Sequence, residues 1–126
     1  DFSVKLNDRD KEIYEKVLKY LNNQEFNTSS IKELSVLNNC DESKLISLIK
    51  IDDSIIIINS NYIITKLSFK KLLDIINLHF KNNDTLSVKD FKEITNTSRK
   101  FAVPLLEYLD KNKITYRIGN ERKKNN

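Results

Sequence analysis

Residues 55–64 read IIIINSNYII, and this stretch decides the fold of the chain. Two runs of β-branched residues flank a short turn of Asn and Ser, which is the pattern of a β-hairpin. Upstream of the hairpin, apolar residues recur at helical spacing in three segments, and we expect caps for these helices at Asp8, Ser30 and Asp41. Three helices followed by a hairpin form the element order of a winged-helix domain, in which the hairpin is the wing.

The same order of elements follows a second time. The expected helices and the expected strand of this second half cover residues 69–80, 87–94, 98–110 and 114–118. An offset of 57 residues aligns Ser30 with Ser87, and caps and apolar faces recur together at this offset. We therefore predict a mostly helical α+β chain of two tandem winged-helix domains, residues 1–66 and 67–126.

The charge of the chain is concentrated in one half. Residues 1–65 hold 8 Lys and Arg against 11 Asp and Glu, whereas residues 66–126 hold 14 against 7, within a net charge of +4. Such asymmetry points to a polyanionic partner, such as a nucleic acid, for the basic half. A lysine-rich surface without a partner is the alternative. We expect the acidic first domain to serve as a spacer that binds no nucleic acid.

The sequence contains no recognisable set of catalytic residues. Cys40 is the only cysteine, which excludes disulfide frameworks and thiolate zinc sites. His79 is the only histidine, so we expect it to be a surface or interface residue rather than a metal ligand. Gly119 is the only glycine, which excludes a glycine-rich nucleotide loop. We expect a chain without catalytic residues, metal or membrane span, in a reducing, cytoplasmic compartment.

A cationic helix start is the first candidate binding feature. Thr97 or Ser98 is expected to cap a helix whose first turn carries Arg99 and Lys100. Cations there oppose the positive end of the helix dipole, so they are better explained if a phosphate binds between them. The alternative is incidental surface charge. Pro104 lies past the first turn, where proline removes a backbone hydrogen bond, so we expect either a kink or an irregular first turn.

The second wing is the other candidate feature. Alternation along residues 114–118 is expected to bury Ile114, Tyr116 and Ile118 and to project Arg117 outward. A turn at Gly119-Asn120 then brings further cations back along the exposed side, whereas the first hairpin carries no Lys or Arg. The candidate nucleic-acid-binding side chains of the helix start and the wing are Ser98, Arg99, Lys100, Arg117, Asn120, Arg122 and Lys123.

Two stretches of the basic half resemble a known family. SRKFAVPLLEYLD at 98–110 and ITYRIGNER at 114–122 resemble the last winged-helix domain of bacterial SelB, the selenocysteine-specific translation elongation factor. The rest of the chain agrees with this family only in fold pattern. Asn120 stands where the family usually has Asp, and it still suits a tight turn.

The resemblance implies an RNA-binding function. Factors of this family carry an N-terminal GTPase and a C-terminal array of winged helices, of which the last binds the selenocysteine insertion element (SECIS), a hairpin in messenger RNA. The chain would then be a monomeric, non-enzymatic C-terminal part without a cofactor of its own. It would contact the mRNA hairpin, while GTP, selenocysteyl-tRNA and the ribosome would be bound by the rest of the factor.

A clamp on the hairpin backbone is the mechanism that we expect from these residues. RNA readers hold the backbone and unstacked loop bases, because A-form helices hide their base edges in a deep groove. Ser98, Arg99 and Lys100 would contact phosphates on one side, and Arg117 and Arg122 on the other, with a splayed base in a small pocket between helix and wing. Five neutralised phosphates predict a slope of log K against log salt between about −3.5 and −4.5.

Two other functions are compatible with the same fold. A winged-helix transcription regulator would lay its third helix in the major groove of duplex DNA. That helix offers few base-reading side chains beyond its first turn, and Glu107 and Asp110 would repel a DNA duplex laid along it. A protein-interaction tandem, with its basic end incidental, is the other possibility.

Overall fold

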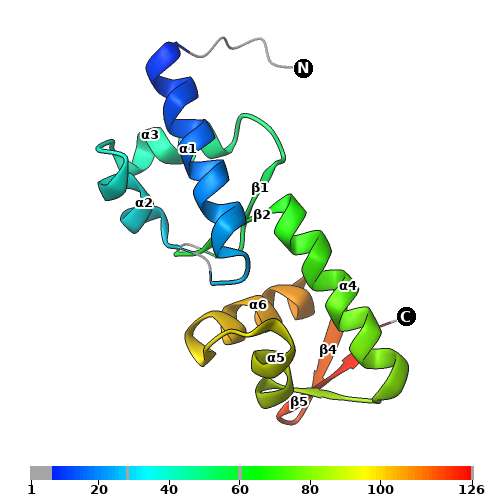
Figure 1. Cartoon of the computed structure of the whole chain (residues 1–126). Helices are drawn as coiled ribbons and strands as arrows, with labels where there is room; N and C mark the ends of the chain where they lie inside the picture. Colours follow the sequence, from blue (N-terminus) through cyan, green and yellow to red (C-terminus); the bar gives the residue numbers. More distant parts are fainter. Residues whose placement is uncertain (1–6, 28, 60, 126) are drawn as a thin grey trace. The chain divides into compact units, whose positions relative to one another are not determined.

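The computed structural model describes residues 7–27, 29–59 and 61–125 (Figure 1). Helices make up most of the described residues, and the strands are short. The predicted class, a mostly helical α+β fold with small hairpins, is therefore confirmed.

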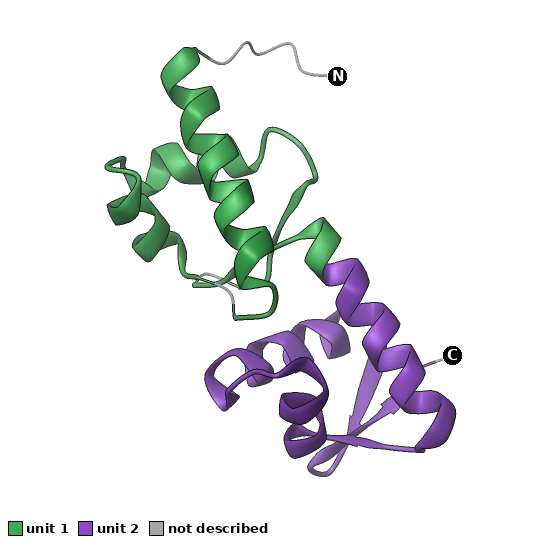
Figure 2. Cartoon of the chain, in the orientation of Figure 1, with its two compact units in different colours: residues 1–68 green, residues 69–126 purple. Residues whose placement is uncertain are grey.

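The chain divides into two compact units, residues 1–68 and 69–126 (Figure 2). Helix α4 (Lys66–Asn82) runs across this division without a break. A domain boundary between residues 66 and 67 stays a prediction, because those residues lie within the first turn of the same helix.

Unit 1 consists of three helices and a hairpin. Its elements are α1 (Asp8–Gln24), α2 (Ile31–Leu37), α3 (Glu42–Ile49), β1 (Ile55–Ile57) and β2 (Ile63–Thr65). The strands pair antiparallel with Ile56 opposite Ile64, as the sequence pattern predicts, and Ser60 in the turn between them lies outside the described residues. Apolar residues from all five elements form one buried core.

The cap of α1 is Asn7 rather than the expected Asp8. Asn7 Oδ1 accepts a hydrogen bond from the backbone N–H of Asp10 at 2.7 Å. Asp8 takes the first helical position, where its charge suits the positive end of the helix. The predicted cap was wrong by one residue because Asn and Asp are about equally good at this position.

Unit 2 consists of most of α4, two further helices and a three-stranded sheet. The elements after α4 are β3 (Leu86–Ser87), α5 (Val88–Thr95), α6 (Arg99–Lys111), β4 (Thr115–Ile118) and β5 (Glu121–Lys124). The sheet has the antiparallel order β3-β5-β4. The sequence did not predict β3, in which Leu86 pairs with Arg122. This short strand fixes the start of α5 beside the wing.

Helices α2 and α5 begin in the same way, at positions 57 residues apart. Ser30 accepts a hydrogen bond from the backbone N–H of Glu33 at 3.1 Å, and the Glu33 carboxylate accepts one from the Ser30 backbone at 3.0 Å. Ser87 and Asp90 form the corresponding bonds at 3.0 and 3.4 Å. Each pair is a capping box, which satisfies two backbone donors that the helix leaves unpaired.

Helix α6 runs from Arg99 to Lys111 and continues through Pro104. Its cap is Ser98, whose carbonyl accepts hydrogen bonds from the backbone N–H of Phe101 at 3.1 Å and of Ala102 at 2.9 Å. The bond from Phe101 spans three residues, as in a 3₁₀ turn. The same carbonyl also accepts the regular α-helical bond from Ala102, so Pro104 lies inside one continuous α-helix.

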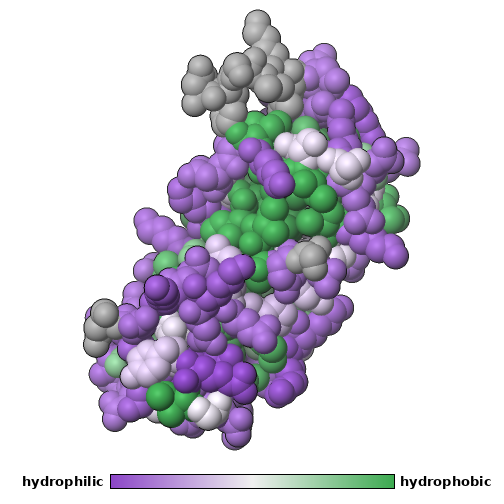
Figure 3. Space-filling model, turned by 180° about the vertical axis from the view of Figure 1, so that it is seen from behind, coloured by the Kyte–Doolittle hydropathy of each residue, from purple (hydrophilic) through white to green (hydrophobic). Residues whose placement is uncertain are grey.

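The surfaces of the two units differ in character. Seen from behind, hydrophobic side chains gather over part of unit 1, whereas the visible face of unit 2 is mainly hydrophilic (Figure 3). The face of unit 2 seen in this view suits a charged partner better than an apolar one.

Candidate nucleic-acid interface

A cavity opens in unit 2 between the starts of α5 and α6 and the wing formed by β4 and β5. Its volume is about 420 Å³. The residues that line it are Ser87, Val88, Lys89, Arg99, Arg117, Asn120 and Arg122. Four of the seven predicted binding residues therefore meet in one place. We call this the helix–wing cavity.

Lys89 is the one cation of this cavity that the sequence reasoning missed. The capping box at Ser87 starts α5, so Lys89 is the second residue of the helix and lies exposed. The signal was present in the sequence, because a cation in a first helical turn is the same feature that identified Arg99. It was overlooked because the short strand that brings Ser87 to the wing was not predicted.

The start of α6 places its three predicted residues differently. Arg99 is exposed and lines the cavity. Lys100 is exposed outside the cavity lining, and its Nζ lies 5.5 Å from the centroid of the Phe101 ring. Ser98 is also exposed, and its side chain makes no capping hydrogen bond, in contrast to Ser87.

The wing turn directs Arg117 toward the cavity. Ile118 and Glu121 are paired, so Gly119 and Asn120 form a two-residue connection, and Gly119 has a φ of +60°. A residue with a side chain would be strained in that conformation. The carbonyl of Gly119 accepts a hydrogen bond from Arg117 Nε at 2.8 Å, which restricts the guanidinium while it remains exposed.

Arg122 is buried, so its expected exposure on the wing is wrong. The residue is 3% exposed, and its Nε and Nη2 lie 3.2 and 3.1 Å from Asp110 Oδ2. Asp110 Oδ1 also accepts a hydrogen bond from Thr115 Oγ1 at 2.6 Å. The face of the wing that carries Arg122 and Thr115 packs on α6. The sequence pattern predicts instead that the opposite face of the wing packs on the core. Arg122 therefore lines the inner wall of the cavity, with its charge balanced.

The other face of the wing carries the residues that were expected in the core. Tyr116 is 43% exposed and Ile118 is 52% exposed, whereas Thr115 is 1% exposed. Lys123 pairs with Tyr116 across the strands, so it lies on that second face and not in the helix–wing cavity. The prediction that side chains alternate between two faces of the strand is correct, but the buried face and the exposed face are the reverse of those predicted.

The two units differ most at the start of their third helices. Helix α3 begins with Asp41 as its cap and Glu42 in its first turn, whereas α6 begins with Ser98 and Arg99. These positions correspond at the offset of 57 residues. The helix dipole favours the acidic start of α3 and disfavours the cationic start of α6.

The described residues form neither a cluster of potential metal ligands nor a helix that could span a membrane. The described part of the chain holds no group of three or more His, Cys, Asp or Glu side chains placed to bind a metal ion. His79 Nε2 lies 2.8 Å from the carbonyl oxygen of Thr85, a local contact within unit 2. Of the helices formed by these residues, none combines the length and apolar character that a membrane span requires.

The fold of unit 2 is that of a winged-helix protein, and its helix–wing cavity is lined by cations. The family described as "Elongation factor SelB, winged helix" matches residues 78–123, which include α5, α6 and the wing. This part of the chain belongs to the winged-helix domains of SelB, as the resemblance of its sequence implied.

Known proteins similar to the chain come from the same family. A selenocysteine-specific elongation factor of Desulfomicrobium baculatum is 32% identical over 95 residues, which are 75% of this chain and 15% of that protein. The mRNA-binding domain of elongation factor SelB from E. coli, solved in complex with SECIS RNA, has the same fold, with a TM-score of 0.77 and 18% identity over 96% of this chain and all of that one. A bacterial selenocysteine-specific elongation factor, EF-Sec, has a TM-score of 0.71 and 26% identity over 97% of this chain and 20% of its own.

Proposed function

We propose that unit 2 binds a hairpin in messenger RNA, the selenocysteine insertion element, through the helix–wing cavity. The observation that carries the proposal is the convergence of Lys89, Arg99 and Arg117 on one cavity from three separate elements. The solved E. coli relative of the same fold is described as an mRNA-binding domain in complex with SECIS RNA, which supports the choice of ligand.

The cavity suits an unstacked base flanked by phosphates. Its mouth carries three exposed cations, and its volume of about 420 Å³ lies within the range of ligand pockets, roughly 300–1,000 Å³. Phosphates on one side of the base would meet Lys89 and Arg99, and those on the other side would meet Arg117. Asn120 offers both a donor and acceptors for a base edge. Arg122 holds the wing on α6, so we assign it a positioning role at the wall of the cavity.

The remaining candidates would contact the RNA outside the cavity. Lys100 and Ser98 lie exposed beside Arg99 at the start of α6, where they can follow the backbone of the hairpin. Lys123 lies on the other face of the wing, so it cannot share a phosphate with Arg117.

The chain spans 15% of the length of the D. baculatum factor that it matches. We therefore propose that it acts as one part of a cytoplasmic translation factor that delivers selenocysteyl-tRNA at UGA codons on the ribosome. GTP binding and hydrolysis would belong to the rest of such a factor. The chain itself would be a monomeric binding module without catalytic residues or a cofactor.

Salt dependence of hairpin affinity tests this function. The accessible cations at the start of α5, at the start of α6 and on the wing are Lys89, Arg99, Lys100 and Arg117. Four neutralised phosphates predict a slope of log K against log salt of about −2.8 to −3.6, less steep than the sequence-based value because Arg122 is already paired. A slope near zero, or preference for duplex DNA in a competition assay, would reject the proposal.

A further inference from the structure

The wing of unit 2 has a second face, outside the helix–wing cavity, which carries Lys123. Strand register places Tyr116 opposite Lys123, on the face away from Arg117 and Arg122. Tyr116 is 43% exposed, and Ile118 on the same strand face is 52% exposed. Large apolar groups kept in solvent side by side mark a binding surface more often than scattered single residues do.

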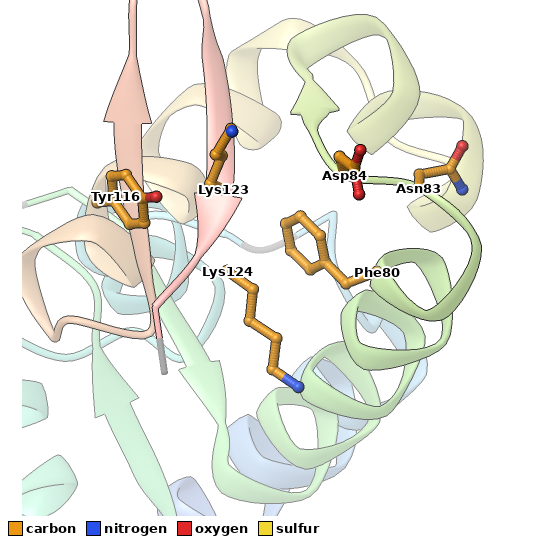
Figure 4. A pocket seen from close by; sticks show the side chains of 6 residues that line it. All are labelled: Phe80, Asn83, Asp84, Tyr116, Lys123 and Lys124. Atoms are coloured by element: carbon orange, nitrogen blue, oxygen red, sulfur yellow. The ribbon is translucent and has the colours of Figure 1, made fainter.

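A second cavity, of about 380 Å³, lies on this face (Figure 4). It is lined by Phe80, Asn83, Asp84, Tyr116, Lys123 and Lys124. In Figure 4, Tyr116 and Lys123 come from neighbouring strands, Phe80 extends from α4 into the space beside them, and Lys124 reaches toward α4. The cavity is thus a cleft with aromatic rings on both walls and ammonium groups at its rim.

The charges of this cleft suit a phosphate backbone with a base attached. Lys123 and Lys124 supply two positive charges against the one carboxylate of Asp84. Neither lysine forms a salt bridge with any residue that the structure describes. Two ammonium groups without a salt bridge, one on each side of β5, flank a cleft that holds an exposed ring, and cations combined with aromatic rings bind single-stranded nucleic acids.

We propose that this face binds unpaired RNA, with one base stacked on Tyr116 and its flanking phosphates at Lys123 and Lys124. Stacking on an aromatic ring accepts any base, because every base has a π-face. The Asp84 carboxylate would repel a phosphate, but it can accept a hydrogen bond from an amino group at the base edge. An acidic peptide would use the lysines and leave the ring and the carboxylate without a role.

The choice of RNA as the ligand rests on the proposed function. The existence of the site rests only on the residues of the cleft. The two sites lie on opposite faces of the same wing, so an RNA hairpin held at the helix–wing cavity could continue as an unpaired strand around the wing. The inference predicts that an unpaired flank adds affinity that the helix–wing cavity does not provide.

Binding of two RNAs to the full chain tests the proposal. The first RNA is the bare hairpin, and the second is the same hairpin with an unpaired flank. Wild-type protein should bind the flanked RNA at least about fivefold more tightly, since one stacked base contributes that much or more. Tyr116→Ala should lose this advantage and keep the affinity for the bare hairpin. Tyr116→Phe should retain the advantage, because it preserves the ring.

Tyr20→Ala is the matched control, because Tyr20 is 38% exposed on α1 of unit 1. This variant should behave as the wild type with both RNAs. Equal affinity of the wild type for the two RNAs, or a full advantage left in Tyr116→Ala, would overturn the proposal.

A short single-stranded oligonucleotide separates this proposal from the proposed function. Its cross-linking to the wild type should be lost in both Tyr116→Ala and Lys123→Ala and retained in Arg99→Ala. A bare hairpin that fails to bind the wild type would contradict the proposed function alone. An oligonucleotide that fails to cross-link would contradict the second site alone.

Discussion

Arg122 directs two nitrogens to the same carboxylate oxygen of Asp110, with Nε at 3.2 Å and Nη2 at 3.1 Å from Oδ2. The Arg122 side chain is 4% exposed and that of Asp110 is 23% exposed. The pair joins β5 to α6 across 12 residues of sequence and so fixes the inner wall of the helix–wing cavity. Its two members are unequal, because the cation is buried and the carboxylate is partly solvated.

That inequality predicts different effects for two substitutions. Asp110→Ala leaves a buried guanidinium without its partner, so the free energy of unfolding should fall by roughly 3–5 kcal/mol. Arg122→Met leaves a carboxylate that still meets water and still accepts a hydrogen bond from Thr115, so a smaller loss of about 1–3 kcal/mol is expected. Urea unfolding of the two variants measures both values.

Glu107→Ala serves as the control for this pair, because Glu107 is an exposed acid on the same helix. Its effect should stay within about 0.5 kcal/mol. If Arg122→Met lowered the free energy of unfolding more than Asp110→Ala does, the unpaired buried guanidinium would not be the larger source of instability.

Two matched pairs of substitutions should separate the RNA-binding unit from the other. Arg99→Ala and Lys89→Ala each remove a cation from the helix–wing cavity, so each should weaken hairpin binding and make the salt slope shallower by about 1 unit. Glu42→Ala and Lys32→Ala change the corresponding positions of unit 1 and should leave both quantities unchanged. Fluorescence anisotropy at several salt concentrations measures affinity and slope together.

If substitutions in the two units reduced hairpin affinity by similar factors, the assignment of the site to unit 2 would be contradicted. Lys11→Ala and Lys19→Ala on α1 extend the comparison, since both residues are exposed cations of unit 1. Neither should weaken hairpin binding.

The capping boxes give a second internal comparison. Ser87→Ala and Ser30→Ala each remove a cap that accepts a backbone hydrogen bond, so each should lower the free energy of unfolding by about 0.5–2 kcal/mol. Only Ser87→Ala should also weaken hairpin binding, because α5 carries Lys89 into the cavity. Thermal unfolding and hairpin titration of the same two samples check this. Equal affinities for the two variants would show that the start of α5 does not position the site.

The sequence predicted the features of this fold that are local. The hairpin at 55–64, the capping serines Ser30 and Ser87 and the cationic start of α6 all follow from residues within a few positions of one another. It also identified Arg99, Arg117 and Asn120, which the structure brings to one cavity. Turns, caps and helix periodicity depend on short-range chemistry, which one sequence states directly.

The features that the sequence could not predict depend on contacts across the fold. A period of two identifies the faces of a strand but not which face is covered, so Tyr116 was assigned to the core and Arg122 to the surface. The choice is made by Asp110, which binds Arg122 and Thr115 from a neighbouring helix. Strand β3 has only two residues, too few for a periodic signal, and without it the place of Lys89 was not foreseen.

A partly buried hydrogen bond in unit 1 predicts how stability depends on pH. Tyr14 Oη donates to Asp52 Oδ1 at 2.6 Å, and the backbone N–H of Ser54 donates to the same oxygen at 3.0 Å. Burial, and then the hydrogen bond to Asp52, raises the pKa of Tyr14 from 10.0 to about 12. The hydrogen bond from Tyr14 lowers the pKa of Asp52 below its ordinary value of 3.8.

The signs of these two shifts fix the pH range over which the bond stabilises the fold. The raised pKa of Tyr14 gives stability that is complete below pH 10 and is lost as the pH rises toward about 12. The lowered pKa of Asp52 gives stability that is present above pH 3.8 and is lost as the pH falls below it. Tyr14→Phe should therefore lower the free energy of unfolding by about 1.5–3 kcal/mol at neutral pH, the usual contribution of a hydrogen bond to a charged acceptor. The difference in free energy of unfolding between Tyr14→Phe and the wild type should decrease below pH 3.8 and above pH 10. Urea unfolding from pH 3 to pH 11 measures it, with Tyr20→Phe as an exposed control, and a gap that stays constant across the whole range would show that the carboxylate is not the acceptor that matters.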